Sequence, residues 1–175
     1  MTRLQCACGE VGLKVAGPPI VSVECCCNSC RAGRARIEAL PGSPTVLGEH
    51  GTTRYELYRK DRVRFASGAE LLREFRLTPA SHTRRVVASC CHTPVFTEFE
   101  NGHWLSLYGG LWPAGTLPAL QMRSMATDLP DPSILSNDVP NARTQSFTFV
   151  ARLLGAWIAM GFRVPKVEVA GRLGG

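Results

Sequence analysis

The residues best suited to chemistry in this chain are its cysteines, six of which lie between Cys6 and Cys30. They form the motifs Cys6-x-Cys8-Gly9 and Cys25-Cys26-Cys27-x-x-Cys30, and the pair Cys90-Cys91 follows later. Thiols clustered in this way bind metals, form disulfides or carry out redox chemistry. We expect metal binding in the cytoplasm, because the first motif begins too early to leave room for a secretory leader, and the cytosol keeps thiols reduced.

The first motif needs partners from elsewhere in the chain. Residues i and i+2 of a strand point to the same face, so Cys6 and Cys8 can bind one ion. Cys90 and Cys91 are the remaining source of thiol ligands outside the second motif. A site with these four thiolates would be closed and structural.

The second motif supplies three ligands by itself. Cys25 and Cys27 share one face of a strand, and Cys30 lies at the spacing of a C-x-x-C turn that closes on zinc. Cys26 then points to the opposite face. Three protein ligands and an open position are the layout of a catalytic zinc, which acts as a Lewis acid. We expect one or two zinc ions; disulfides and an iron–sulfur cluster are the alternatives.

Length and composition favour one mainly β domain with an extension in this chain of 175 residues. Hydrophobic residues make up 45% of the sequence, and 12 prolines with 17 glycines indicate many turns. Frequent turns favour a β-rich fold over a helical bundle. The net charge of +6 comes mainly from arginine and suits an acidic small molecule, nucleic acid or simply a solvated surface.

The pattern of apolar residues predicts antiparallel sheet around the cysteines. Val11, Leu13 and Val15 alternate with other residues, which predicts a strand pair within residues 1–16. Residues 31–51 are rich in Gly, Pro and Arg and predict a loop with short strands. Further strands are expected at residues 20–23, 53–59, 62–66, 71–78, 84–89, 95–100 and 104–108, with a hairpin turn at Asn101-Gly102.

The C-terminal part is expected to be an extension (residues 113–175) of the zinc-binding domain (residues 1–112). Residues 113–141 are punctuated by proline and predict an extended connection with one short helix near Leu120. Residues 146–162 are apolar apart from Arg152, which predicts a helix packed on the domain or at a homodimer interface. The length and Arg152 argue against a membrane span.

The order of the motifs resembles the glutathione-dependent formaldehyde-activating enzyme family, which includes centromere protein V. The resemblance covers residues 4–112 and rests on Cys6-x-Cys8-Gly9, Cys25-x-Cys27-x-x-Cys30-Arg31 and Cys91-x-Thr93-Pro94. It implies a small, mostly antiparallel Mss4-like β fold built around zinc. It also implies carbon–sulfur lyase activity on the adduct of glutathione and formaldehyde. By this resemblance, Cys6 and Cys8 belong to a structural zinc site, and Cys25, Cys27 and Cys30 hold the active-site zinc.

The chain departs from the family pattern at three positions. The later motif of the family is Cys-x-x-Cys-Gly, but Ala88 and His92 stand at its first and last positions. Cys90 is the candidate to replace the missing ligand, and His92 is a second candidate. Cys26 stands where the family usually has histidine, which bears on the substrate more than on metal binding.

The function expected from these features is a zinc-dependent, lyase-like protein that acts on or binds a small thiol adduct such as S-hydroxymethylglutathione. Arg31, Arg34 and Arg36 follow the second motif and are candidates to hold the carboxylates of glutathione, although a solvated basic loop has the same composition. No residue stands out as a general base.

A non-catalytic, zinc-stabilised module that binds nucleic acid or a protein is the alternative function. Its basic footprint would be interleaved with aromatic residues and would consist of Arg54, Arg59, Lys60, Arg62 and Arg64. Half-buried strands show the same alternation, so we do not expect nucleic acid as the partner. In a third reading, Cys26 completes the second site and the protein is structural or a redox sensor.

Overall fold

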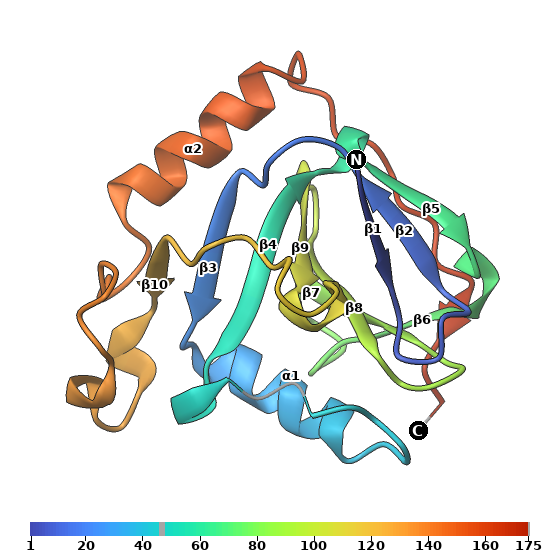
Figure 1. Cartoon of the computed structure of the whole chain (residues 1–175), viewed down its shortest axis with the longest axis horizontal. Helices are drawn as coiled ribbons and strands as arrows, with labels where there is room; N and C mark the ends of the chain where they lie inside the picture. Colours follow the sequence, from blue (N-terminus) through green and yellow to red (C-terminus); the bar gives the residue numbers. More distant parts are fainter. Residues whose placement is uncertain (46–47, 175) are drawn as a thin grey trace.

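The structure, a computed structural model, describes residues 1–45 and 48–174, whose strands form two sheets (Figure 1). The smaller sheet is antiparallel and has the order β1-β2-β5, with β1 (Thr2–Gln5), β2 (Gly12–Val15) and β5 (Val63–Ser67). The larger sheet has the order β10-β3-β4-β9-β8-β7-β6-β11. The expected mainly β, antiparallel architecture is therefore confirmed.

The central strands of the larger sheet are antiparallel: β3 (Val21–Cys25), β4 (Thr53–Arg59), β9 (Trp104–Tyr108), β8 (Pro94–Phe99), β7 (Thr83–Ala88) and β6 (Leu72–Phe75). Two short edge strands pair in parallel, β10 (Met122–Ser124) with β3 and β11 (Gly171–Arg172) with β6. The part of the chain expected to be an extension thus supplies both edges of this sheet.

The described helices are α1 (Asn28–Glu38) and α2 (Phe147–Ile158). Short 3-10 turns connect strands at η1 (Glu49–Gly51), η2 (Lys60–Arg62), η3 (Ala69–Leu71), η4 (Gly109–Leu111), η5 (Ala126–Asp128) and η6 (Pro132–Ile134).

The two faces of the larger sheet bury separate cores. The first core joins it to the smaller sheet, where Val11, Leu13 and Val15 are completely buried, as their alternation predicts. The second core lies on the opposite face and includes Ile37 of α1 and Phe149 of α2. The helices therefore cover the face that carries the end of β3 and the second cysteine motif.

Helix α1 corrects the expectation of a loop with short strands in residues 31–51. The helix begins because Cys27 caps it: the Cys27 Sγ accepts a hydrogen bond from the backbone N–H of Cys30 at 3.3 Å. Alanine and arginine then favour a helix, and Ile37 anchors it in the core. Gly33 lies within the helix, and its lack of a side chain leaves room for the Arg85 side chain of β7.

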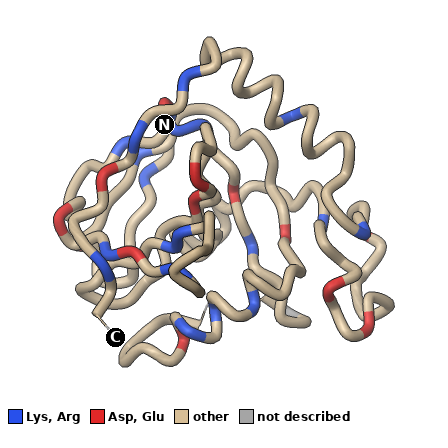
Figure 2. The backbone as a smooth tube through the Cα atoms, turned by 180° about the vertical axis from the view of Figure 1, so that it is seen from behind, with Lys and Arg blue, Asp and Glu red and all other residues tan. Residues whose placement is uncertain are grey.

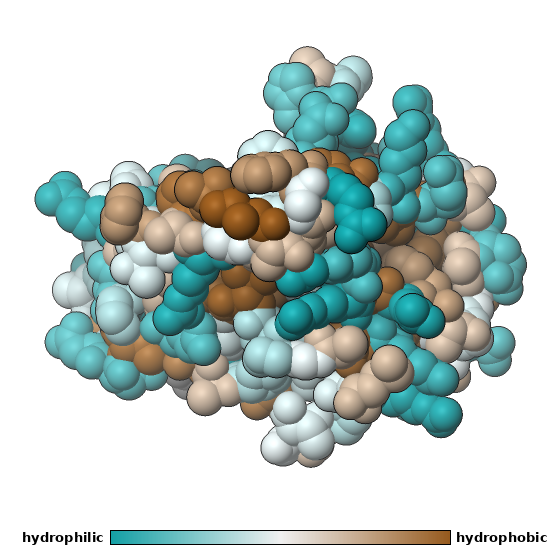
Figure 3. All heavy atoms as spheres, turned by 90° about the horizontal axis from the view of Figure 1, so that it is seen from above, coloured by the Kyte–Doolittle hydropathy of each residue, from teal (hydrophilic) through white to brown (hydrophobic). Residues whose placement is uncertain are grey.

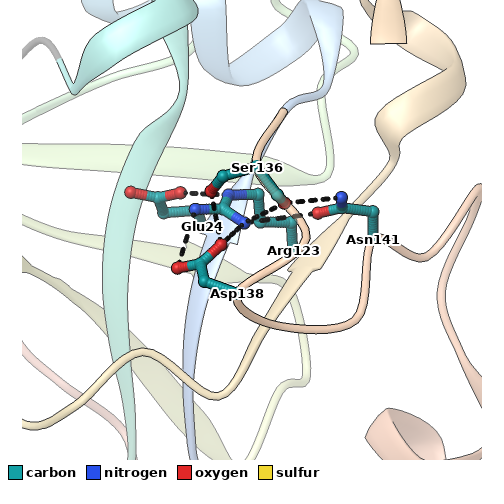
Figure 4. A network of polar contacts seen from close by, with 5 residues as sticks. All are labelled: Glu24, Arg123, Ser136, Asp138 and Asn141. Atoms are coloured by element: carbon teal, nitrogen blue, oxygen red, sulfur yellow. Dashed lines mark hydrogen bonds and ion pairs between the residues drawn. The ribbon is translucent and has the colours of Figure 1, made fainter. Parts of the chain in front are cut away.

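Strand β10 corrects the expectation of a short helix near Leu120. Arg123, in the centre of β10, holds it against β3 and the following loop (Figure 4). Its guanidinium donates to Glu24 of β3 at 2.8 Å and to Asp138 at 2.7 Å. The same group also donates to the carbonyl of Ser136 at 3.1 Å. This network around the buried Arg123 places the residues that follow β10 beside the second cysteine motif.

Helix α2 lies beside β3 (Figure 1). Large apolar residues occur on both its inner and its outer face. Ser146 caps it, and Phe149, Leu153 and Trp157 face the protein. The outer face exposes a stripe of large apolar side chains, visible from the side on which α2 lies (Figure 3): Phe147 (88% exposed), Val150 (49%), Leu154 (49%) and Ile158 (55%). Within the described residues, no helix has the length and apolarity needed to cross a membrane.

Candidate metal centres

The structure brings Cys6, Cys8, Cys90 and Cys91 together, with all four sulfurs within 4.8 Å of one another. The Cys8 and Cys90 sulfurs are 3.3 Å apart, and the Cys6 sulfur lies 3.5 Å from Cys8 and 3.9 Å from Cys90. Four sulfurs at about 2.3 Å from a tetrahedral zinc are about 3.8 Å apart, whereas a disulfide requires about 2.05 Å. The spacing therefore fits a four-thiolate zinc site and does not fit disulfides.

Two tight turns position these four sulfurs. The chain leaves β1 at Cys6 and returns to β2 through Gly9, whose φ of 84° is a left-handed conformation that favours glycine. The backbone N–H of Val11 donates to the Cys6 sulfur at 3.3 Å, a contact that stabilises a thiolate. We call this group, Cys6, Cys8, Cys90 and Cys91, the closed site.

The turn between β7 and β8 explains how two adjacent cysteines reach one site. His92 adopts a left-handed conformation with φ of 53°, which turns the chain immediately after Cys91. The His92 ring hydrogen-bonds to the carbonyl of Pro41 at 2.8 Å and is not part of the sulfur group. Ala88 is completely buried in the core. Cys90 therefore takes the place of the missing fourth ligand in the closed site, whereas His92 does not reach it.

The closed site already favours one ionised sulfur. Burial raises the pKa of Cys91, but hydrogen bonds from the side chain and backbone of Thr93 and from Cys8 lower it to about 6. Burial and hydrogen bonds with the other thiols raise the pKa of Cys90. Thiols that compete in this way for negative charge are suited to a shared cation, which allows all of them to ionise.

Cys25, Cys27 and Cys30 form the second group, and their sulfurs also lie within 4.8 Å of one another. Cys25 ends β3, Cys27 caps α1 and Cys30 lies in the first turn of α1. The convergence expected from the sequence is present, but a strand–helix junction produces it instead of a continuous strand. We call this group the open site, because it has three cysteines and no fourth His, Cys, Asp or Glu among the described residues.

Cys26 points away from the open site, as expected. It is completely buried in a small cluster with Ala126, Leu129 and Leu135, which follow β10. Burial raises the pKa of the Cys26 thiol to about 11. A neutral thiol in an apolar cluster does not serve as a metal ligand.

The open site concentrates negative charge on Cys27. Hydrogen bonds from the Cys25 and Cys30 thiols lower the pKa of Cys27 to about 2 against the effect of burial, and the positive charge of Arg85 adds to this lowering. The hydrogen bond to Cys27, followed by that to Cys30 and by burial, strongly raises the pKa of Cys25. Three thiols in contact hold one charge readily and resist further ionisation, so a cation would be needed to ionise all three.

Arg85 is a functional candidate that sequence reasoning missed. It lies on β7, is 1% exposed, and its Nη2 donates to the carbonyl and Oγ of Ser29 at 2.8 Å each. Its Nε and Nη1 are buried without a hydrogen-bond partner. Burying a guanidinium without hydrogen-bond partners costs free energy. We infer that Arg85 compensates the negative charge of the cysteines beside it. The sequence signal for this residue is the pair Arg84-Arg85 directly before Val86-Val87. Adjacent residues of a strand point to opposite faces, so one of the two arginines must face the core.

A chain of hydroxyl groups also adjoins the open site. The Tyr55 hydroxyl donates to the Cys30 sulfur at 3.7 Å and lies 3.2 Å from the Thr97 Oγ1. Thr97 in turn contacts the Tyr108 hydroxyl at 3.3 Å. Burial raises the pKa of Tyr55 well above its usual value, so this hydroxyl is a neutral donor to sulfur.

The open site faces a cavity of about 830 Å³ between the larger sheet and α2. Cys25, Cys27 and Cys30 line it, together with Arg85 and Tyr55. Ligand pockets typically have volumes of about 300–1,000 Å³, so a small molecule fits. A second cavity, of about 550 Å³, reaches Cys6 of the closed site, but four cysteines there would fill all the positions of a tetrahedral ion.

The arginines expected to bind glutathione do not line this cavity. Arg31 donates to Asn28 and to the carbonyl of Asp128. Arg34 is buried against the carbonyl of Thr52, and Arg36 donates to the carbonyl of Arg76 while covering the Phe75 ring. Thus Arg31 steadies the start of α1, and none of the three side chains is among those that surround the cavity.

Comparisons with known proteins leave the family open. No family model and no curated protein matches this chain. Among solved structures, a crystal structure of a Rhodobacter sphaeroides protein is similar at a TM-score of 0.48 and 16% identity, covering 80% of this chain and 99% of that one.

Proposed function

We propose that this protein binds zinc at both cysteine groups and that the open site binds a small thiol or thiol adduct, whose carbon–sulfur bond it breaks or forms. The proposal includes membership of the formaldehyde-activating family, with its Mss4-like fold and its cytoplasmic location. The observation that carries it is the pairing of three converging sulfurs with a cavity of ligand size. The closed site, with its four sulfurs, has a structural role in this proposal.

The donor sets fit the proposed metal. Thiolates suit zinc and also iron, and the spacing of the four sulfurs in the closed site matches a tetrahedral ion. In the open site, Cys25, Cys27 and Cys30 would hold zinc, which supplies a Lewis-acid position that favours the thiolate form of a bound thiol.

The residues around the open site have distinct tasks in this proposal. Arg85 offsets the negative charge of the three cysteines and of the incoming sulfur. Tyr55 donates to Cys30 and orients it. In the cleavage of an S-hydroxymethyl thiol, the carbon–sulfur electron pair stays on sulfur, the hydroxyl oxygen becomes the carbonyl oxygen of formaldehyde, and the hydroxyl proton leaves to water. The thiol regains a proton on release, so the reaction balances without an oxidant.

Metal analysis combined with thiol binding tests the proposal. We expect two zinc ions per chain in the purified protein, and one in Cys25→Ser, which also loses thiol binding measured by calorimetry. Cys26→Ser is the matched control and keeps both ions, because Cys26 faces away from the site. Iron in place of zinc, or two zinc ions with no affinity for any thiol, would contradict the proposal.

The alternative, a non-catalytic binding module, receives less support from the surface. Basic residues are distributed along many elements, with acidic residues between them (Figure 2). Of the expected footprint, Arg54, Arg59 and Lys60 form ion pairs with neighbouring carboxylates. These cations are engaged within the protein, so the cavity is the better-supported binding site. Retention on immobilised nucleic acid that decreases with salt would favour the alternative.

We also propose that the outer face of α2 forms a homodimer interface. Its exposed stripe of Phe147, Val150, Leu154 and Ile158 exceeds what a lone surface helix ordinarily carries. Sedimentation of the wild type and of Leu154→Glu tests this point: a dimer that becomes a monomer supports it, and a wild-type monomer contradicts it.

A further inference from the structure

The cavity beside the open site has two chemically different ends. The cysteines, Arg85 and the Tyr55 hydroxyl form one end. Tyr55 and Leu57 are two residues apart on β4 and line the same wall, so the other end begins about 7 Å away. A molecule with its sulfur at the open site therefore extends its remaining atoms towards this second end.

The second end is apolar and rich in aromatic rings. Phe99 and Trp104 lie on the sheet side with ring centroids 5.9 Å apart, and Phe149, Leu153 and Trp157 of α2 lie on the opposite side. Such walls favour an aromatic or branched apolar group.

His103 joins the two sides of this apolar end. Its Nε2 donates to the carbonyl of Leu153 at 2.9 Å, and its ring stacks on Trp157 at 5.6 Å with an interplanar angle of 7°. Burial lowers the pKa of His103, so the ring is neutral at pH 7 and adds no cation. These two contacts hold α2 against the hairpin between β8 and β9, and they fix the position of the apolar wall.

The charges around the cavity do not suit glutathione. Among the described residues that line it, Arg85 is the one lysine or arginine, and it belongs to the end that carries the cysteines; Glu100 and Asp128 are the acidic ones. Glutathione carries two carboxylates and an ammonium group beyond its sulfur. These groups would lie against aromatic rings without cations to receive the carboxylates, at a large desolvation cost.

We propose that the ligand of the open site is a hydrophobic thiol, or its adduct with an aldehyde, with an aryl or branched alkyl body close to the sulfur. This inference rests on the proposed function, because it takes thiol binding at the open site as given. It changes the expected substrate class from a peptide thiol to an apolar one.

The test uses zinc-loaded protein and three probes: 2-phenylethanethiol, glutathione and 2-phenylethanol. Trp104 and Trp157 line the cavity, so their fluorescence reports binding without an activity assay. We expect 2-phenylethanethiol to bind at least about tenfold more tightly than glutathione and than 2-phenylethanol, which lacks the sulfur.

Two neighbouring residues of α2 provide matched variants. Leu153 lines the cavity, whereas Leu154 is on the exposed face. Leu153→Ala is expected to weaken 2-phenylethanethiol binding about tenfold, and Leu154→Ala to leave it unchanged.

The outcomes separate this inference from the proposed function. If glutathione binds as tightly as 2-phenylethanethiol, or Leu153→Ala has no effect, the apolar substrate class is wrong while thiol binding stands. If neither thiol binds, or 2-phenylethanol binds as tightly as the thiol, the open site does not recognise sulfur and the proposed function fails.

Discussion

The closed and open sites use the same ligand atom, yet the chain surrounds them differently. The closed site takes its sulfurs from two turns more than eighty residues apart and ties the smaller sheet to the β7–β8 turn. The open site takes its sulfurs from one six-residue stretch, Cys25–Cys30, and lies beside a cavity and a buried arginine. A metal bound by four thiolates from distant segments would stabilise the fold, whereas a metal bound by three thiolates would keep one position open for a ligand.

The largest effect that tests this comparison is expected from Cys8→Ser in the closed site. The Cys8 side chain is exposed, so its replacement removes a ligand with little loss of packing. We expect the loss of one metal ion and of several kcal/mol of stability, because metal binding at such a site is linked to folding. Urea denaturation with metal analysis measures both. Unchanged stability would show that this group of sulfurs is not a structural metal site.

A smaller effect on stability is expected from Cys27→Ser in the open site. Serine caps helices well, so the hydrogen bond to the N–H of Cys30 is replaced and α1 keeps its start. The variant should lose the metal of the open site and thiol binding, with a change in stability below about 1 kcal/mol. Cys27→Ala, the companion variant, loses the cap as well. If Cys27→Ser lost as much stability as Cys8→Ser, the two sites would not differ in their contribution to folding.

Substitution of Arg85 tests whether the open site needs a positive charge. Arg85→Met removes two unpartnered buried nitrogens but also the two hydrogen bonds to Ser29, so we expect little net change in stability. Thiol affinity should decrease about tenfold, because the bound sulfur then adds negative charge without compensation. Arg85→Lys should recover part of this affinity. Equal affinity in Arg85→Met and the wild type would assign Arg85 a purely structural role.

A matched pair of glycines in the two helices tests how closely α1 packs on Arg85. A Cβ at Gly33 of α1 would lie 2.0 Å from the Arg85 Nε, whereas a Cβ at Gly155 of α2 meets nothing within 4 Å. Gly33→Ala should therefore lower stability by about 1–3 kcal/mol and displace the guanidinium.

Gly155→Ala serves as the control and should raise stability by about 0.5–1 kcal/mol, because alanine favours helix. Thermal melts of both variants, with thiol titrations, measure the contrast. Similar changes in both variants would contradict the close packing of α1 on Arg85.

The sequence predicted much of the sheet, because alternation and turns are local signals. The expected strands at residues 53–59 and 104–108 have the observed limits. Helix α1 was missed because its start depends on Cys27, which was assigned to a strand, and because Gly33 resembles a turn signal. Strand β10 was missed because three residues carry too little pattern, and Arg123 holds them in place through partners distant in sequence.

The sequence by itself determined which thiols could act together, because the spacing within Cys6-x-Cys8 and Cys25-x-Cys27-x-x-Cys30 restricts how far apart their sulfurs can lie. Elimination within the sequence pointed to Cys90 and Cys91 as partners of the first motif, and the tertiary structure brings both to it through the left-handed turn at His92. Only the tertiary structure placed Arg85 and the aromatic face of α2 around the second motif. These residues are distant in sequence, and their proximity depends on sheet register and helix packing, which no local pattern specifies.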